Sequence, residues 1–120
     1  MKYRIFRTDT ADAHIHKIVL FIAEKFGSDV ALEKLDELES NIMMLADDPY
    51  IGEEPRYTLL RRQGYRVLVT EKDLVFYKVD DSQKRVTVYA VVDQRQDYLR
   101  ILRGIKVITV VKKMTDFVNY

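Results

Sequence analysis

The spacing of apolar residues changes once along the chain, and this change constrains the fold more than any other feature. In segments 11–26 and 31–45, apolar side chains recur every three or four residues. This spacing is typical of amphipathic helices, so two helices are predicted. Gly27 suits the end of the first helix, and Ser28 suits a cap of the second. Because only about two residues separate the helices, an antiparallel helical hairpin is favoured.

Beyond residue 56 the apolar spacing becomes two. Segments 65–69, 74–79 and 86–92 are rich in β-branched and aromatic residues and are joined by short polar turns. They predict three strands of an antiparallel meander. A short strand is also predicted at 3–7 and a short helix at 97–102. The expected fold is therefore α+β: an N-terminal short strand, an αα-hairpin packed on an antiparallel β-meander, and a short C-terminal helix.

Size and composition fit one globular domain, which we assign to residues 1–103. The chain has no cysteine, which excludes disulfide scaffolds, thiolate zinc sites and cysteine nucleophiles and suits a reducing cytoplasm. No apolar run approaches the roughly 20 residues of a membrane helix, so no membrane partner is expected. Residues 104–120 form a β-branched extension of uncertain structure, which would add an edge strand or pair with a second copy in a homodimer.

The net charge of +1 is the average of two unlike regions. Residues 24–54 hold ten acidic and two basic side chains, whereas residues 56–113 hold fourteen basic and six acidic ones. The acidic region is interpreted as the solvated face of the helical hairpin. The charge of the basic region bears on which partners the protein binds and does not help to predict the fold.

Two groups of arginine and tyrosine residues are the candidate target-binding residues. The first precedes and enters the first meander strand, and the second follows the last one. Such side chains suit phosphate groups and stacked bases if the two groups converge, and they form surface ion pairs if they do not. The two groups are Arg61, Arg62, Tyr65 and Arg66, and Arg95, Tyr98, Arg100 and Arg103.

Metal and cofactor chemistry is not expected. The two histidines, His14 and His16, are spaced i, i+2 on a helix, so they point about 200° apart and do not share a metal. The four glycines are scattered, and no glycine-rich phosphate loop is present. No cofactor and no metal site are predicted.

The order of elements and their motifs resemble the RelE/ParE superfamily of toxins from type II toxin–antitoxin modules. The resemblance covers residues 3–102 and is strongest over 74–80 and 86–102. It implies a cytoplasmic toxin of an addiction or plasmid-stabilisation module, held inactive by a cognate antitoxin. We expect the antitoxin to contact the sheet edge and the arginine-bearing side.

Within the superfamily, the long hairpin looks closer to the ParE branch, whose members poison DNA gyrase. The RelE branch comprises ribosome-dependent, metal-independent endoribonucleases that cut mRNA. Leu74 stands where those nucleases commonly carry an arginine, and Asp93 stands where many relatives carry a histidine. If the chain is nevertheless a nuclease, its candidate catalytic residues are Arg62, Arg66, Arg95 and Tyr98.

Three functions therefore remain open from the sequence. The first is growth arrest by binding and inhibiting gyrase, which requires no catalytic residue. The second is mRNA cleavage on the ribosome, and the third is a non-toxic binding module of the same fold. The chain is an enzyme only in the second case.

Overall fold

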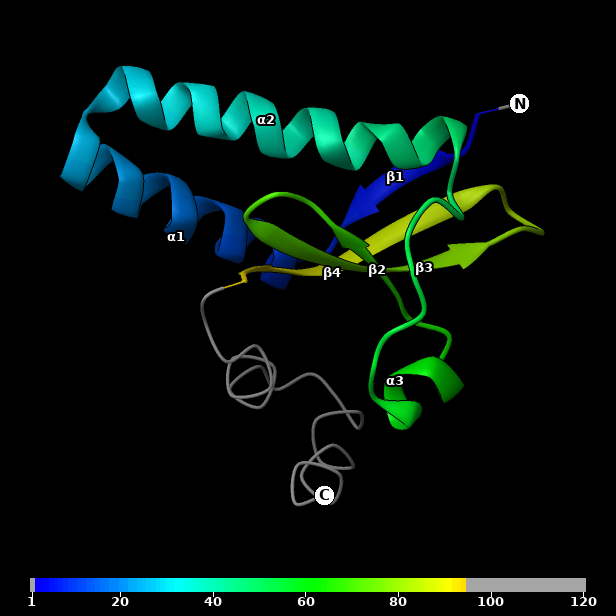
Figure 1. Cartoon of the computed structure of the whole chain (residues 1–120). Helices are drawn as coiled ribbons and strands as arrows, with labels where there is room; N and C mark the ends of the chain where they lie inside the picture. The colour runs from blue at the N-terminus through cyan, green and yellow to red at the C-terminus, as the bar shows by residue number, and fades with distance from the viewer. Residues whose placement is uncertain (1, 95–120) are drawn as a thin grey trace.

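Three helices and four strands make up residues 2–94, the part of the chain that the computed structural model describes (Figure 1). They run in the order β1 (Arg4–Arg7), α1 (Asp9–Phe26), α2 (Ser28–Asp47), α3 (Thr58–Arg62), β2 (Arg66–Val69), β3 (Asp73–Asp80) and β4 (Arg85–Asp93). The predicted α+β architecture is confirmed. The helix expected at 97–102 and the extension at 104–120 lie outside the described residues. Within residues 2–94, no helix is long and apolar enough to cross a membrane.

Helices α1 and α2 form the predicted hairpin. The hydroxyl of Thr8 caps α1 by accepting a hydrogen bond from the backbone N–H of Ala11 at 3.0 Å. The connection is shorter than expected, because Gly27 alone separates the helices and Ser28 is already the first residue of α2. Gly27 has φ +95°, a conformation that L side chains rarely adopt, and this explains a glycine at the bend.

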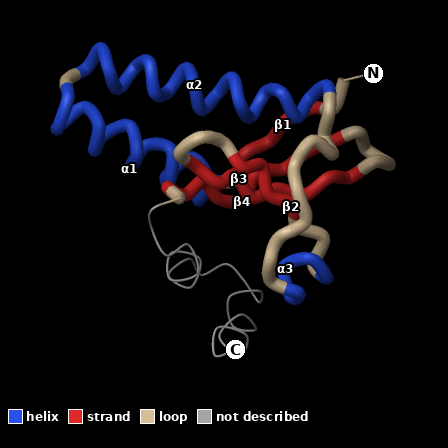
Figure 2. The backbone as a smooth tube through the Cα atoms, in the orientation of Figure 1, coloured by secondary structure: helices blue, strands red, loops and turns tan. Residues whose placement is uncertain are grey.

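The sheet has the strand order β1-β4-β3-β2 (Figure 2). Strands β2, β3 and β4 form the predicted antiparallel meander. Strand β1 pairs with β4 in parallel, so the whole sheet is mixed. The hairpin makes this pairing possible, because a parallel neighbour requires a long crossover connection.

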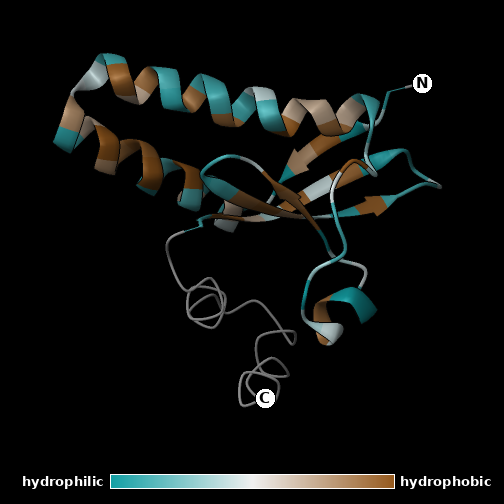
Figure 3. Cartoon of the chain, viewed as in Figure 1, coloured by the Kyte–Doolittle hydropathy of each residue, from teal (hydrophilic) through white to brown (hydrophobic). Residues whose placement is uncertain are grey.

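The hairpin covers one face of the sheet. Apolar side chains of both helices pack there against alternate residues of β3 and β4. Figure 3 shows the resulting alternation of apolar and polar segments along α1 and α2. Fully buried members of this cluster include Leu38, Ile42, Val75 and Val88.

The short helix α3 covers part of the opposite face, in a region where the apolar spacing predicts no helix. Two consecutive leucines, Leu59 and Leu60, are both buried there against Tyr65 and Val67. A strand sends successive side chains to opposite faces, whereas a helical turn brings neighbours to one side. The need to bury both leucines on the same face therefore favours a helix in this segment, to which the sequence pattern assigns no element.

A β-bulge in β4 changes which residues face α3. Phe76 pairs with Ala90 and Tyr77 pairs with Val88, so Tyr89 has no opposite residue in β3. As a result, both Tyr89 and Ala90 pack with the cluster around α3.

The acidic side chains of α2 are mostly exposed, in agreement with their interpretation as a solvated face. One basic residue of this helix behaves differently. Lys34 is buried, and its ammonium lies 2.5 Å from the carboxylate of Asp73 at the start of β3. This ion pair joins the hairpin to the meander.

Candidate functional site

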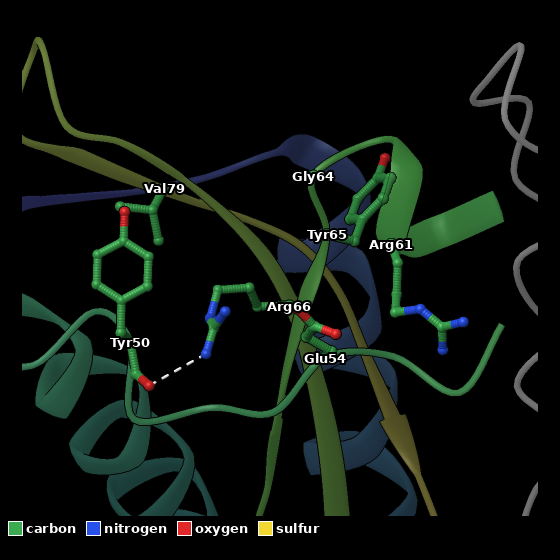
Figure 4. Close-up of a pocket in the computed structure, with 7 residues that line it drawn as sticks. All are labelled: Tyr50, Glu54, Arg61, Gly64, Tyr65, Arg66 and Val79. Carbon is green, nitrogen blue, oxygen red and sulfur yellow. Dashed lines mark hydrogen bonds between the residues drawn. The ribbon is translucent and has the colours of Figure 1, made fainter. Parts of the chain in front are cut away.

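Three of the predicted site residues meet at the point where the chain enters β2. Arg61, Tyr65 and Arg66 line an open pocket of about 220 Å³. Figure 4 shows Tyr50 and Tyr65 on opposite sides of this pocket, with Arg66 between them. The lining is completed by Tyr50, Glu54, Gly64 and Val79.

The loop after α2 brings Tyr50 and Glu54 to this place. Glu53 exchanges two backbone hydrogen bonds with Val67 of β2, at 2.7 and 2.9 Å. The hydroxyl of Tyr77, which is fully buried, donates to the carbonyl of Pro49 at 2.8 Å and accepts from the N–H of Gly52 at 3.1 Å. These bonds fix the loop against the outer edge of β2.

Arg66 holds the same loop from within the pocket. Its guanidinium donates to the carbonyl oxygens of Tyr50 and Gly52, at 3.1 and 2.5 Å. It also lies 5.1 Å from the centre of the Tyr50 ring, within cation–π distance. Arg66 therefore uses two of its hydrogen bonds to hold the loop after α2 in place.

Arg61 is bonded to its own loop, whereas Arg62 is not. The guanidinium of Arg61 donates to the carbonyl oxygens of Pro55 and Arg56 at 2.8 and 3.0 Å and to the hydroxyl of Thr58 at 3.1 Å. Arg62 is exposed, and its side chain has no hydrogen bond or ion pair within residues 2–94. Of the arginines predicted in this group, Arg62 is the one whose side chain is not held by other groups of residues 2–94.

Tyr65 is a buried, neutral phenol. It is 7% exposed, and its ring lies edge-to-face against Tyr89 with 5.3 Å between the ring centres. Burial, with a smaller contribution from Tyr89, raises the pKa of Tyr65 to about 12. At neutral pH this hydroxyl is fully protonated, so it donates a hydrogen bond or packs against a ligand but does not serve as a base.

The sequence reasoning missed Lys78, which lies beside Tyr65. The ammonium of Lys78 is 4.5 Å from the ring centre of Tyr65 and 5.4 Å from that of Tyr89. Burial lowers the pKa of Lys78 below its usual value. Its sequence signal was the one charged residue inside the otherwise apolar segment 74–79.

Tyr50, at the opposite wall, belongs to a hydrogen-bond network centred on Asp81. Both Tyr3 and Tyr50 donate their hydroxyls to this carboxylate at 2.6 Å. The bond to Asp81, followed by burial, raises the pKa of Tyr50 to about 12. The same two bonds lower the pKa of Asp81 below its ordinary value of 3.8.

The Asp81 network predicts a pH dependence of stability. Because its folded-state pKa is lowered, Asp81 stabilises the fold above its unfolded pKa of 3.8, and this contribution is lost as pH falls through the folded value. We expect the melting temperature of Asp81→Asn to lie below that of the wild type at pH 7, with the gap closing below pH 3.8. Thermal melts across pH 2.5–8 measure this gap, and a constant gap would contradict the assignment.

His14 contacts the backbone of β4. His14 Nδ1 accepts a hydrogen bond from the backbone N–H of Val91 at 3.1 Å, and burial, with a smaller effect of Lys17, lowers its pKa. This ring therefore helps to fasten α1 to β4. Across residues 2–94 no group of three or more histidine, aspartate or glutamate side chains is placed to hold a metal ion.

The second predicted group follows β4 in the sequence. Its members Arg95, Tyr98, Arg100 and Arg103 lie outside the described residues. Their roles, and the convergence of the two groups, stay predictions.

Comparisons with known proteins place the chain in a family. Residues 5–98 match the sequence model of the family described as the ParE toxin of the type II toxin–antitoxin system, parDE. No curated protein matches the chain.

Two solved toxin–antitoxin structures share the fold. A chain of the toxin–antitoxin complex RelBE2 from Mycobacterium tuberculosis aligns with a TM-score of 0.60 and 19% identity, over 80% of this chain and 95% of the RelBE2 chain. A chain of the chromosomal ParDE system from P. aeruginosa aligns with a TM-score of 0.64 and 16% identity, over 77% of this chain and 96% of that one. Together with the family match, these similarities confirm the RelE/ParE fold that the sequence resembles. The chain therefore belongs to the ParE family of toxins of type II toxin–antitoxin systems, within the RelE/ParE superfamily.

Proposed function

We propose that this toxin arrests growth in the bacterial cytoplasm by binding and inhibiting DNA gyrase, rather than by cutting mRNA. The main observation in support of this proposal is that the Arg66 side chain is already hydrogen-bonded within the protein. Its guanidinium is bonded to the carbonyl oxygens of Tyr50 and Gly52, so turning it toward a scissile phosphate would release the loop after α2. A protein that inhibits gyrase by binding does not require Arg66 to contact a scissile phosphate, so the loop stays in place.

The neighbouring tyrosine supports the same choice. Attack by an RNA 2′-hydroxyl requires a general base whose pKa lies near the working pH. The pKa of Tyr65, about 12, is far above that range. Leu74, which is partly buried beside the α3 cluster, also supplies no cation where RelE-type nucleases commonly carry an arginine.

A gyrase inhibitor instead needs an exposed contact surface. Arg62 supplies an exposed guanidinium at the end of α3. We propose that Arg95, Arg100 and Arg103 extend this surface. Arginine is common among the residues that dominate binding energy at protein interfaces, because its planar group makes several hydrogen bonds at once.

The direct test is a supercoiling assay with purified toxin, DNA gyrase and relaxed plasmid. We expect loss of supercoiling and trapped cleavage complexes. Primer extension on translated mRNA should show no new ribosome-dependent ends. Normal supercoiling together with new mRNA ends would establish the nuclease instead, and normal growth on induction without antitoxin would favour the non-toxic binding module.

Two alanine variants, at Arg62 and at Arg56, can be compared in this assay. We expect Arg62→Ala to raise the toxin concentration for half-inhibition about 10- to 30-fold, as for loss of an interface anchor. Arg56→Ala is the control, because Arg56 is also exposed and contributes only its backbone carbonyl to a hydrogen bond with Arg61. Equal inhibition by both variants would remove Arg62 from the contact surface.

A further inference from the structure

The sheet face opposite the hairpin carries a row of residues that runs from β1 across β4 and β3 to the start of β2. Phe6 of β1 pairs with Thr87 of β4, and Thr87 pairs with Lys78 of β3. The Lys78 ammonium in turn contacts the ring of Tyr65, which immediately precedes β2. Because the alternate residues of β3 and β4 are buried under the hairpin, these side chains lie on the other face. We call Phe6, Thr87, Lys78 and Tyr65, with Tyr89 beside them, the cross-strand row.

Cations and aromatic rings alternate in and beside this row. Lys78 lies against the rings of Tyr65 and Tyr89. The guanidinium groups of Arg4 and Arg85 lie 5.5 and 5.6 Å from the centre of the Phe6 ring, which is 42% exposed. The surface is therefore positively charged and has an aromatic side chain available for contact.

The cations of this face lack sufficient acceptors within the described part of the chain. Lys78 has no carboxylate within ion-pair distance and no hydrogen-bond acceptor among residues 2–94, and the buried Nε of Arg85 has no hydrogen-bond partner there. The carboxylate of Asp80 is 3.9 Å from Arg85, but it already accepts hydrogen bonds from the hydroxyl of Ser82 and the N–H of Gln83.

Leaving a half-buried ammonium without an acceptor is unfavourable, because water that would solvate the charge is partly excluded. The lowered pKa of Lys78 reflects the same desolvation. A partner that brings a carboxylate to this point would supply the missing acceptor in a partly dehydrated setting, where a charge-assisted hydrogen bond is strong.

We propose that the cross-strand row is a docking surface for the cognate antitoxin, with an Asp or Glu side chain of the antitoxin on Lys78 and apolar side chains against Phe6 and Tyr89. The proposal rests on membership of a toxin–antitoxin family and is independent of whether the toxin's target is gyrase. It goes beyond the arginines at the start of β2, because it assigns a specific lysine on the sheet to neutralisation.

Charge favours a peptide over a nucleic acid as the occupant. A nucleic acid strand gains affinity by meeting several cations along its phosphates. Within residues 2–94 this face has three such cations, and the carboxylate of Asp80, 3.9 Å from Arg85, would repel a phosphate beside one of them. A single carboxylate flanked by apolar side chains matches one lysine between aromatic rings more closely.

The test compares two lysine-to-methionine variants of the full chain. The ligand is the antitoxin encoded beside the toxin, and affinity is measured by titration calorimetry or surface binding. We expect Lys78→Met to weaken the complex about 10- to 100-fold, the usual effect of losing a hydrogen-bonded charge partner at an interface. Lys72→Met, at an exposed position in the β2–β3 turn, should change the affinity by less than about 2-fold.

Stability of the free toxin separates docking from a structural role. Met preserves the length and apolar contacts of the lysine stem, so we expect Lys78→Met to melt at the same or a higher temperature than the wild type. A lower melting temperature would mean that the toxin itself supplies the acceptor, and this would overturn the proposal. Unchanged antitoxin affinity would also overturn it.

Binding of a fluorescent single-stranded oligonucleotide tests the other occupant. If Lys78→Met weakens oligonucleotide binding and leaves antitoxin affinity intact, the row is a nucleic-acid surface and the proposal is wrong. If it weakens the antitoxin alone, an antitoxin variant with one acidic residue changed to lysine should restore binding to Lys78→Glu. None of these readouts uses gyrase, so failure here and failure of the proposed function are distinguishable.

Discussion

Lys34→Ala is expected to lower the free energy of unfolding by about 3–5 kcal/mol, because it leaves the Asp73 carboxylate buried without its partner. Asp73 is 1% exposed, and its carboxylate lies 2.5 Å from the Lys34 ammonium. The same substitution should lower the melting temperature by on the order of 10–20 °C. Urea denaturation followed by circular dichroism measures the change, since the chain has no tryptophan for a fluorescence signal.

A double variant separates the coupling of the pair from the loss of its packing. Lys34→Met with Asp73→Leu replaces both charges by apolar groups, and we expect a stability within about 2 kcal/mol of the wild type. Glu37 provides a control, because its exposed carboxylate lies 3.7 Å from the same ammonium and its removal should cost less than about 1 kcal/mol. A double variant as unstable as Lys34→Ala would contradict the role of the ion pair.

This ion pair could not be predicted from the sequence, although the elements that carry it could. The apolar spacing predicts α2 and the meander correctly, because each pattern is local and repeats over several turns or residues. The same spacing assigns the polar residues of α2 to water. Lys34 is an exception because Asp73 meets it from β3, and that meeting depends on how the hairpin packs on the sheet.

Two details of the fold depend on long-range constraints and were not predicted. Nothing local in 3–7 tells whether β1 runs parallel or antiparallel to β4, because both directions suit the same alternation. The helix α3, to which the sequence pattern assigns no element, forms because Leu59 and Leu60 share one buried face. In both cases the rest of the sheet supplies the information.

The sequence predicts which residues of the candidate site lie close together, but it does not predict what their side chains contact. The sequence correctly places Arg61, Tyr65 and Arg66 close together, since they are near neighbours along the chain. It does not show that carbonyl groups of the loop between α2 and α3 accept hydrogen bonds from both Arg61 and Arg66. Lys78 was missed because its contacts with Tyr65 and Tyr89 depend on how β2, β3 and β4 pair, which no local pattern shows.

Gly52→Ala is expected to destabilise the toxin by about 2–4 kcal/mol, through overpacking and loss of the hydrogen bonds around Tyr77. A Cβ atom at this position would lie 2.7 Å from the carbonyl oxygen of Val67 and closer still to the Tyr77 hydroxyl. Real Cβ atoms essentially never approach that closely, and a backbone oxygen in a sheet does not move away cheaply. The loop after α2 must then separate from β2, which also opens the pocket at Tyr50 and Arg66.

A second substitution tests this cause. Tyr77→Phe alone should cost about 1–3 kcal/mol, because the N–H of Gly52 and the carbonyl of Pro49 lose their buried partner. Combined with Gly52→Ala, it removes the most crowded atom, so the double variant should be more stable than the sum of the two single effects predicts. Gly64→Ala is the control: its position has open space but φ +88°, and only backbone strain of about 1 kcal/mol is expected. Strict additivity at Gly52 and Tyr77, measured by urea denaturation, would show that the Tyr77 hydroxyl is not what excludes a side chain there.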